Sequence, residues 1–305
     1  MKTLARVTVS VPATTSNLGP GFDCLGLALS LRNELTLELR DGSGPATIEI
    51  EGQGANSLPR SEKNLLVRAA RMILPRSLPG RLVFSSLNRI PLARGLGSSA
   101  AAAVAGLWAG SHLFGTLRVS EDQLEEMAVA LEGHPDNVAP CVHGGLTASL
   151  IDGRRSTAHR LNIHPSLSAV VCIPDFELKT TKARAALPKS VPMADAVYNA
   201  SRSILLAGAL ETGHTNHLAE LMTDRLHQPY RAKLIPGMSE AIAAALKAGA
   251  VGAALSGSGP TVFAFVENDD GEKVGAAMQR AFAKKRVSSR SLELDVDHQG
   301  VRIES

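Results

Sequence analysis

Alternating apolar and polar residues mark the beginning of the chain. Residues 7–11 read Val-Thr-Val-Ser-Val and residues 35–39 read Leu-Thr-Leu-Glu-Leu, a period of two in both segments. This period is typical of β-strands that bury one face. We therefore expect strands over both segments and over residues 47–51, which continue the pattern after a turn. A further strand is predicted over residues 81–86, which read Arg-Leu-Val-Phe-Ser-Ser.

Several segments of the first half of the chain show the spacing of apolar residues that is typical of helices. Ser61 is expected to begin a helix with apolar residues on one face, which Pro75 ends. A second, alanine-rich helix is predicted over residues 100–113. It is too short and too polar at its end to span a membrane, so we expect a buried helix. Ser120 is expected to cap a third helix with an acidic first turn, which the helix dipole favours.

The second half of the chain alternates helices with strands. Strands are predicted over residues 167–173, 261–266 and 292–296. No repeat of fixed period is present. We interpret the chain as an α+β protein of two domains, residues 1–155 and 156–305, which meet in the segment from Arg154 to Asn162.

The composition is that of an ordinary globular protein. Of the 305 residues, 44% are hydrophobic and 20% charged, and the net charge of +3 is too small to argue for nucleic acid or a membrane as partner. Aromatic residues make up 3%, too few for a platform that stacks single-stranded bases. The three cysteines form no C-x-x-C pair, and the N-terminus lacks the apolar core of a signal peptide. We therefore expect a reduced, cytoplasmic protein.

A glycine-bearing turn links the strand at 81–86 to the alanine-rich helix. Gly95 and Gly97 lack Cβ atoms, so the backbone there can take positive φ and approach a ligand closely. Ser98 and Ser99 stand where a helix cap is expected, and the first amides and the dipole of the helix favour a phosphate. No Gly-Lys-Ser/Thr follows the glycines, which excludes a Walker A loop. The segment predicted to cradle phosphate consists of Pro91, Leu92, Ala93, Arg94, Gly95, Leu96, Gly97, Ser98, Ser99, Ala100 and Ala101.

Three further segments carry candidate chemistry. Residues 12–23 form a loop with Asn17 and Asp23, and its hydrogen-bonding groups suit a small polar ligand, although Asn, Gly and Pro are also routine turn residues. Residues 132–137 join two acids, a histidine and an amide, and carboxylates beside a phosphate site usually hold Mg²⁺. Residues 249–260 are glycine-rich, which is weak evidence alone. We expect this last segment to pack against the phosphate loop or to contribute amides to it.

In this order, the four segments resemble the GHMP kinase superfamily. Its ATP signature, Pro-x-x-x-Gly-Leu-Gly-Ser-Ser-Ala-Ala, is matched at residues 91–101. Residues 12–23 and 132–140 are similar to the homoserine kinases in particular, and the likeness runs from residue 9 to about residue 266. The resemblance implies an N-terminal domain like the second domain of ribosomal protein S5 and a ferredoxin-like C-terminal domain. It also implies Mg²⁺- and ATP-dependent phosphorylation of the L-homoserine hydroxyl, giving O-phospho-L-homoserine and ADP, before threonine synthase in threonine biosynthesis.

The same resemblance implies roles for single residues. The amides from Gly95 to Ala100 would hold the ATP phosphates, Ser98 and Glu132 would ligate Mg²⁺, and Asn64 would lie by the nucleotide base. The substrate-side positions are Asn17, Asp23, His134, Asn137, Arg184 and Arg231. A carboxylate complements an ammonium group, so Asp23 suits the homoserine ammonium. A guanidinium grips a carboxylate with two hydrogen bonds, so the two arginines suit the carboxylate, with a surface position as the alternative for both. The family also suggests a homodimer.

No residue stands out as a general base. Asn137 occupies the place where other superfamily members carry an aspartate, and an amide cannot accept a proton. We hypothesise transfer without a dedicated base, with Asp136 and Asp23 as the remaining candidates. Two other functions stay open: a GHMP kinase for another small alcohol, such as an isoprenoid precursor or shikimate, and a ligand-binding protein that kept the fold without catalysis. Asp23 and the arginines favour an amino acid, and the intact Ser98, Glu132 and glycine loop favour an enzyme.

Overall fold

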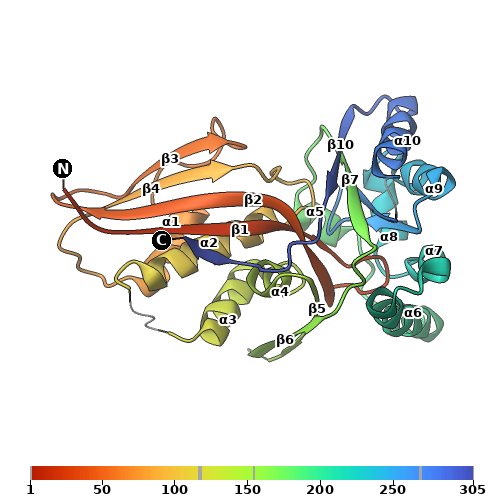
Figure 1. Cartoon of the computed structure of the whole chain (residues 1–305), viewed down its shortest axis with the longest axis horizontal. Helices are drawn as coiled ribbons and strands as arrows, with labels where there is room; N and C mark the ends of the chain where they lie inside the picture. Colours follow the sequence, from red (N-terminus) through yellow and green to blue (C-terminus); the bar gives the residue numbers. More distant parts are fainter. Residues whose placement is uncertain (1, 116–118, 154, 268–269, 305) are drawn as a thin grey trace.

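The fold is described from a computed structural model that places residues 2–115, 119–153, 155–267 and 270–304. The chain forms two β-sheets, one of seven strands and one of four. Figure 1 shows that each sheet has its own helices. This arrangement confirms the predicted α+β chain of two domains. The loop that leads into α2 (Ser98–His112) lies where the two domains meet.

The larger sheet is built mainly from the first half of the chain. Its strands are β1 (Thr3–Ser16), β2 (Leu25–Arg40), β3 (Thr47–Gly52), β4 (Arg81–Asn88), β5 (Leu146–Asp152), β6 (Arg155–Leu161) and β11 (Arg302–Glu304). They follow the order β11-β1-β2-β4-β3, and β5 pairs with both β2 and β6. In β2 the apolar Leu35, Leu37 and Leu39 are buried and the polar residues between them are half-buried, as the period of two predicted.

Four helices accompany this sheet: α1 (Leu65–Ile73), α2, α3 (Glu121–Glu132) and α4 (Val138–His143). Helices α2, α3 and α4 contact its strands, and α1 packs against α2. The alanine-rich α2 is buried, as predicted. Small residues let α2 and α1 approach closely, because a Cβ at Gly106 would lie 2.5 Å from the carbonyl oxygen of Leu66. Among the residues that the structure describes, no helix has the length and apolar character needed to cross a membrane.

The smaller sheet is antiparallel, with the order β10-β7-β9-β8. Its strands are β7 (Ser168–Pro174), β8 (Gly252–Leu255), β9 (Val262–Val266) and β10 (Ser289–Leu294). Helices α9 (Met238–Ala248) and α10 (Gly271–Lys284) pack together against it. The segment between β7 and α9 holds α5 (Thr180–Ala185), α6 (Met193–Thr212), η1 (Thr215–His217), α7 (Leu218–Leu221), α8 (Gln228–Arg231) and η2 (Ala232–Leu234).

The predicted start of the first helix is wrong. Helix α1 begins at Leu65 rather than at Ser61, because the side chain of Asn64 caps it. The Oδ1 atom of Asn64 accepts a hydrogen bond from the Leu66 amide at 3.0 Å. The cap predicted at Ser120 is confirmed, and a reciprocal hydrogen bond between its backbone and the side chain of the third helical residue completes a capping box.

The chain crosses between the two domains more than once. Strand β6 pairs with β5, and β11 returns to pair with β1, where Ile303 lies opposite Val9. Hydrogen bonding therefore assigns residues 155–161 and 302–304 to the larger sheet. Arg154, at one end of the predicted boundary segment, lies outside the described residues. The division at 155/156 stays a prediction. The strand predicted over residues 292–296 as the last of the chain is β10, which ends at Leu294 and is followed by β11.

A hydrogen-bonded ion pair joins α3 to α4. The Nε2 atom of His143 lies 2.8 Å from Oε2 of Glu125, a buried carboxylate. The hydrogen bond with Glu125 raises the pKa of His143, against the opposing effect of burial. The pair therefore links the helix that ends at Glu132 to the helix that begins at Val138.

Replacing His143 with glutamine is expected to lower stability more at pH 6 than at pH 9. Because the folded state raises the pKa of His143, its stabilising contribution is complete below the ordinary value of about 6.5 and is lost as the pH rises through the folded-state value. Since the imidazole is partly exposed, solvent screening limits the difference to at most about 1 kcal/mol. Urea unfolding at both pH values measures it, and an equal loss at both would contradict a charged pair.

Candidate active site

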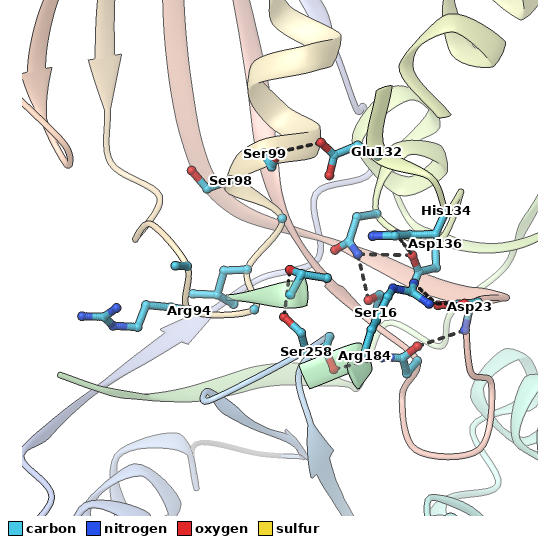
Figure 2. Close-up of a pocket in the computed structure, with 18 of the residues that line it drawn as sticks. Ser16, Asp23, Arg94, Ser98, Ser99, Glu132, His134, Asp136, Arg184 and Ser258 are labelled. Carbon is cyan, nitrogen blue, oxygen red and sulfur yellow. Dashed lines mark hydrogen bonds and ion pairs between the residues drawn. The ribbon is translucent and has the colours of Figure 1, made fainter. Parts of the chain in front are cut away.

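A cavity opens between the domains beside the first turn of α2, and Figure 2 shows its lining. Most of the predicted site residues meet there: the loop from Ala93 to Ser99 together with Asn17, Asp23, Glu132, His134, Asn137, Arg184 and Arg231. Ala101, Leu92 and Asn64 line a second cavity instead. Ala100 is buried, and Pro91 contributes to neither cavity.

Both predicted glycines take the left-handed backbone conformation, with φ of 78° at Gly95 and 68° at Gly97. Neither position has room for a side chain. A Cβ at Gly95 would lie 2.2 Å from the carbonyl oxygen of Ser256, and one at Gly97 would lie 1.9 Å from Oγ1 of Thr14. The loop therefore needs glycine at both positions for its backbone conformation and for close packing.

The start of α2 differs from the prediction in one respect. Ser98 and Ser99 are the first two residues of the helix, and Gly97 takes the cap position. Among the described residues, no side chain accepts a hydrogen bond as a cap of this helix. The amides of the first turn, which have no partner within the helix, are thus directed into the cavity together with the positive end of the helix dipole. This arrangement is suited to phosphate oxygens.

The glycine-rich segment at residues 249–260 packs against the phosphate loop, as predicted. The Ser256 hydroxyl donates to the carbonyl oxygen of Gly95 at 2.6 Å, and the amide of Gly257 donates to the carbonyl of Ser16 at 3.1 Å. The second domain therefore holds the loop of the first domain by direct hydrogen bonds. Gly257 and Ser258 also line the cavity.

Glu132 approaches the helix start from the end of α3. The hydroxyl beside it belongs to Ser99, whose Oγ donates to Oε1 of Glu132 at 2.5 Å, whereas Ser98 points away from Glu132 in Figure 2. Consecutive helical residues point about 100° apart, which is why only one of the two serines faces this carboxylate. Burial raises the pKa of Glu132. A hydroxyl and a carboxylate are hard oxygen donors that suit Mg²⁺, and no cluster of three or more acidic, histidine or cysteine ligands occurs among the described residues.

His134 and Asp136 form a close pair on the other side of the cavity. The Nδ1 atom of His134 lies 2.6 Å from Oδ1 of Asp136, and the carboxylate is 2% exposed. Burial alone would lower the pKa of His134, but the hydrogen bond and the negative charge of Asp136 raise it. Burial alone would likewise raise the pKa of Asp136, and the hydrogen bond with His134 lowers it. The two residues therefore favour the ion-paired state.

Asn137 is held at both ends of its side-chain amide. Its Oδ1 accepts from the Thr14 hydroxyl at 2.8 Å, and its Nδ2 donates to Oγ of Ser16 at 2.9 Å. Both partners lie at the end of β1, so Asn137 joins the N-terminus of α4 to this strand. The loop that follows, residues 17–24 between β1 and β2, is called the substrate-side loop below. The sequence did not single out Thr14 or Ser16 as site residues, because nothing local distinguishes them from the other hydroxyl residues of that segment.

Asp23 and Arg184 bind each other. The two guanidinium nitrogens of Arg184 lie 2.9 Å and 2.7 Å from the two carboxylate oxygens of Asp23, a bidentate pair between the β1–β2 loop and α5. Both side chains are about one-third exposed. The sequence-based prediction assigned them to different charged groups of the ligand, Asp23 to the ammonium and Arg184 to the carboxylate. Their contact places one acidic and one basic ligand-binding group side by side.

Arg231 is deeply buried at the base of the same cavity, which excludes the surface alternative for this arginine. It is 2% exposed, and its Nη1 donates to the carbonyl oxygen of Gly257 at 2.9 Å. Burial lowers its pKa to about 10, which still leaves the side chain charged at neutral pH. No acidic residue in the described part of the chain forms an ion pair with it. A buried cation without an anion is costly, so this position favours an anionic ligand.

A polar network behind the cavity was not predicted from the sequence. The neutral ring of His227 joins Arg231 to the substrate-side loop: its Nδ1 lies 3.2 Å from Arg231, and its Nε2 lies 2.8 Å from the carbonyl oxygen of Gly19. Burial lowers the pKa of His227 to about 4. Asn199 of α6 donates to the carbonyl oxygen of Pro20 at 3.0 Å and to Asp224 at 2.7 Å. These residues are separated by long stretches of chain, so no local motif reveals them.

A second, largely apolar cavity lies on the other side of the first turn of α2. Ala93, Ser98 and Ser99 line both cavities, so a single ligand can occupy the two by passing the phosphate loop. Asn64 lines this second cavity, but its amide is engaged in capping α1 and in donating to Pro59 at 2.8 Å. The apolar lining suits a flat heterocyclic ring.

A two-domain fold with this glycine loop and uncapped helix start defines a GHMP kinase. The family model for the GHMP kinases N terminal domain matches residues 64–145, and the model for the GHMP kinases C terminal domain matches residues 206–284. The chain is 48% identical over 288 residues to a homoserine kinase from Moorella thermoacetica, covering 94% of this chain and 96% of that one. It is 42% identical over 303 residues to a homoserine kinase from Synechococcus sp. (strain CC9605), covering 97% and 95%. The chain belongs to the homoserine kinase family.

Solved structures agree with this assignment. The structure is similar to the crystal structure of homoserine kinase from Cytophaga hutchinsonii, with a TM-score of 0.88, 31% identity and coverage of 98% of this chain and 97% of that one. A mevalonate kinase structure, 14% identical with a TM-score of 0.71, shares the fold. The resemblance inferred from the four sequence segments is thereby confirmed.

Proposed function

We propose that this chain transfers the γ-phosphoryl group of ATP to the side-chain hydroxyl of L-homoserine, giving O-phospho-L-homoserine and ADP, a step of threonine biosynthesis. The observation that carries this proposal is the position of Arg231 in the cavity that the phosphate loop lines. It is a buried cation that forms no ion pair with any residue the structure describes. Such a cation favours a ligand with an anionic group beside it. The carboxylate of a zwitterionic amino acid would supply this group.

The amino acid would be held by the charged groups around the cavity. Its carboxylate would lie against Arg231 and Arg184, and its ammonium against Asp23, with Asn17 and His134 beside them. In this arrangement the zwitterion takes over both halves of the Asp23–Arg184 ion pair, so neither charge is left unpaired on binding. Mevalonate and shikimate carry a carboxylate but no ammonium group, so either would leave Asp23 without a partner, which argues against both as substrates.

The nucleotide would span the two cavities. Its phosphates would accept hydrogen bonds from the amides between Gly95 and Ala100, and its base would enter the apolar cavity near Asn64. Glu132 and the serines at the start of α2 would hold Mg²⁺, which neutralises phosphate charge when bound. These groups supply positioning and electrostatic stabilisation, the main requirements of phosphoryl transfer.

Replacing Asp136 or Asp23 by asparagine is expected to lower the rate of the chemical step only moderately. The pKa of Asp136 is held low by His134, which makes its carboxylate a weak base, and Asp23 is occupied by charge pairing. We expect single-turnover rates at saturating substrate to fall by less than about 100-fold for either variant. The Asp23→Asn variant should show its main effect as a raised KM for homoserine. A collapse for one variant alone, with circular dichroism unchanged, would identify a dedicated base.

The function is tested by measuring ADP release from purified protein with ATP and each of four acceptors: homoserine, mevalonate, shikimate and threonine. Activity with homoserine alone supports the proposal. Activity with another alcohol would redirect it within the superfamily, and no activity with any acceptor would favour a binding protein. We further propose a cytoplasmic location, from the cysteine pattern, and a homodimer, from the family.

A further inference from the structure

His227 lies behind the wall of the polar cavity, directly before α8. Its ring is fully buried and lines neither of the two cavities. Phe22 of the substrate-side loop stacks on this ring, with the ring centroids 5.2 Å apart and the planes inclined by 24°. The backbone amide of His227 donates to Oδ2 of Asp224 at 2.9 Å. Packing on its face and hydrogen bonding of its backbone therefore fix the position of the ring.

Both ring nitrogens of His227 are hydrogen-bonded, and their partners determine which nitrogen carries the hydrogen. The carbonyl oxygen of Gly19, 2.8 Å from Nε2, can only accept a hydrogen bond, so Nε2 must donate. A guanidinium can only donate, so Nδ1, which lies 3.2 Å from Nη1 of Arg231, must accept. The neutral ring with its hydrogen on Nε2 is the form that satisfies both contacts.

Asp224 does not compete for this hydrogen. Its Oδ2 lies 3.6 Å from Nε2 of His227, beyond hydrogen-bond distance, and accepts from the backbone amides of His227 and Gln228 at 2.9 Å and 2.6 Å. Its Oδ1 accepts from the side chain of Asn199 at 2.7 Å and from the amide of Leu226 at 2.8 Å. The carboxylate thus fixes the start of α8 and leaves the ring to its two other partners.

The contact with His227 also determines which edge of the Arg231 guanidinium is left for a ligand. Nη1 is used by protein acceptors, because it donates both to His227 and to the carbonyl oxygen of Gly257 at 2.9 Å. Nε is buried and has no hydrogen-bond partner among the described residues. The edge formed by Nε and Nη2 is therefore the edge for a carboxylate, which can accept two parallel hydrogen bonds.

The substrate-side loop is tied to the same carbonyl oxygen as Arg231. Nδ2 of Asn17 donates to the carbonyl oxygen of Gly257 at 3.0 Å, and Oδ1 of Asn17 accepts from the backbone amide of Asp23 at 3.0 Å. The proposed ammonium-binding group and the proposed carboxylate-binding group thus belong to one hydrogen-bonded frame. The ring of His227 is the rigid member of this frame, because an imidazole has no internal rotation.

We propose that His227 is a positioning residue, which sets the spacing between Arg231 and the substrate-side loop so that the carboxylate and the ammonium of one α-amino acid bind together. Both charged groups of every α-amino acid are attached to the same carbon, so their spacing is nearly constant, and a rigid ring suits a constant spacing. This inference rests on the proposed function. It adds to that function a source of selectivity for amino acids that lies outside the cavity lining.

Two variants separate the two contacts of the ring. His227→Asn keeps an acceptor near the place of Nδ1 but loses the donor to Gly19, so it releases the substrate-side loop. His227→Gln keeps a donor near the place of Nε2 but loses the acceptor for Arg231. The matched control is His143→Gln, which also removes a hydrogen-bonded imidazole but lies outside the cavity lining. It should leave the KM for homoserine unchanged.

Selectivity for the ammonium group is measured with 4-hydroxybutyrate, which is homoserine without its amino group. The ratio of kcat/KM for homoserine to kcat/KM for 4-hydroxybutyrate should fall about tenfold or more in His227→Asn. A loss of stability alone would lower both values and leave the ratio unchanged. His227→Gln should lower kcat/KM for both acceptors by about 10- to 100-fold, since both carry the carboxylate. The KM for ATP should change little in either variant.

The outcomes distinguish this inference from the proposed function. A wild type that is inactive with homoserine would refute the proposed function and this inference with it. If the wild type is active and His227→Asn keeps the wild-type ratio, or His227→Gln keeps the wild-type kcat/KM for both acceptors, only the positioning role of His227 is refuted.

Nitrogen NMR of the wild-type protein with isotope-labelled histidine tests the geometry without any acceptor. The ring of His227, assigned through its contacts with Phe22, should be neutral with its hydrogen on Nε2 at pH 6, below the ordinary histidine pKa of about 6.5. A hydrogen on Nδ1 would face the guanidinium of Arg231. Finding a hydrogen on Nδ1 would therefore overturn the inference, even if neither variant folds.

Discussion

Replacing Gly97 with alanine is expected to lower kcat/KM for ATP by about a thousandfold while the chain still folds. The added Cβ would lie 1.9 Å from Oγ1 of Thr14 and 3.2 Å from Oδ1 of Asn137. These two buried atoms are joined by a hydrogen bond. The loop would have to move, and with it the amides of the first turn of α2. Steady-state kinetics and calorimetric titration with ADP measure the loss.

Gly42 provides the control for backbone strain. Its φ is +103°, yet a Cβ there would meet nothing within 4 Å. Gly42→Ala therefore imposes a left-handed conformation on alanine without a steric clash, at a cost of about 1–3 kcal/mol in stability. We expect this variant to lose stability but to retain activity. If Gly97→Ala also retained the affinity for ADP, the loop could not be the phosphate site.

Replacing Glu132 with glutamine is expected to lower kcat by about 100- to 1,000-fold and to raise the Mg²⁺ concentration for half-maximal activity. The carboxylate contacts Ser99 at the start of α2, and burial raises its pKa, so an ion bound there would also offset the desolvation of its charge. Glutamine keeps the size and one oxygen but removes the negative charge. Rates measured over a range of Mg²⁺ concentrations separate weaker metal binding from a slower chemical step.

Glu126→Gln is the matched control for this change, because Glu126 lies on the same helix and does not line the cavity. It should leave the Mg²⁺ dependence unchanged. An Mg²⁺ dependence of Glu132→Gln equal to that of the wild type would remove Glu132 from the metal site, and the phosphate charge would then have to be balanced by the loop amides and the arginines alone.

The strands and the phosphate loop could be predicted because their signals are local. An alternation such as that in residues 35–39 indicates which face of a strand is buried. The two glycines of the loop indicate positive φ because they lack a Cβ atom. The start of α1 was missed because both Ser61 and Asn64 are good caps, and the choice between them depends on how the preceding loop packs. The order of the strands in the sheets depends on contacts between distant segments.

The residues of the site were predicted better than their contacts. Motif likeness brought Asp23, Arg184 and Arg231 to one ligand, but it did not reveal that the first two pair with each other or that the third is buried. Ser99, rather than Ser98, meets Glu132 because of the rotation between successive helical residues, which a motif does not encode. Such details depend on the angle at which each side chain leaves its element, and only coordinates give that angle.

The return of the chain to its first sheet has a consequence for biosynthesis. Strand β11 pairs with β1, and Arg32 of β2 donates to the carbonyl oxygen of Gly300 at 2.8 Å. The pairing of β11 with β1 can therefore form only after residues 300–304 have left the ribosome. By then the complete second domain has already been made. The nascent chain must carry an open sheet edge at β1 through most of its translation. Chaperones that shield exposed strands would act on this edge, and translation stalled before residue 300 would leave the first domain unfinished.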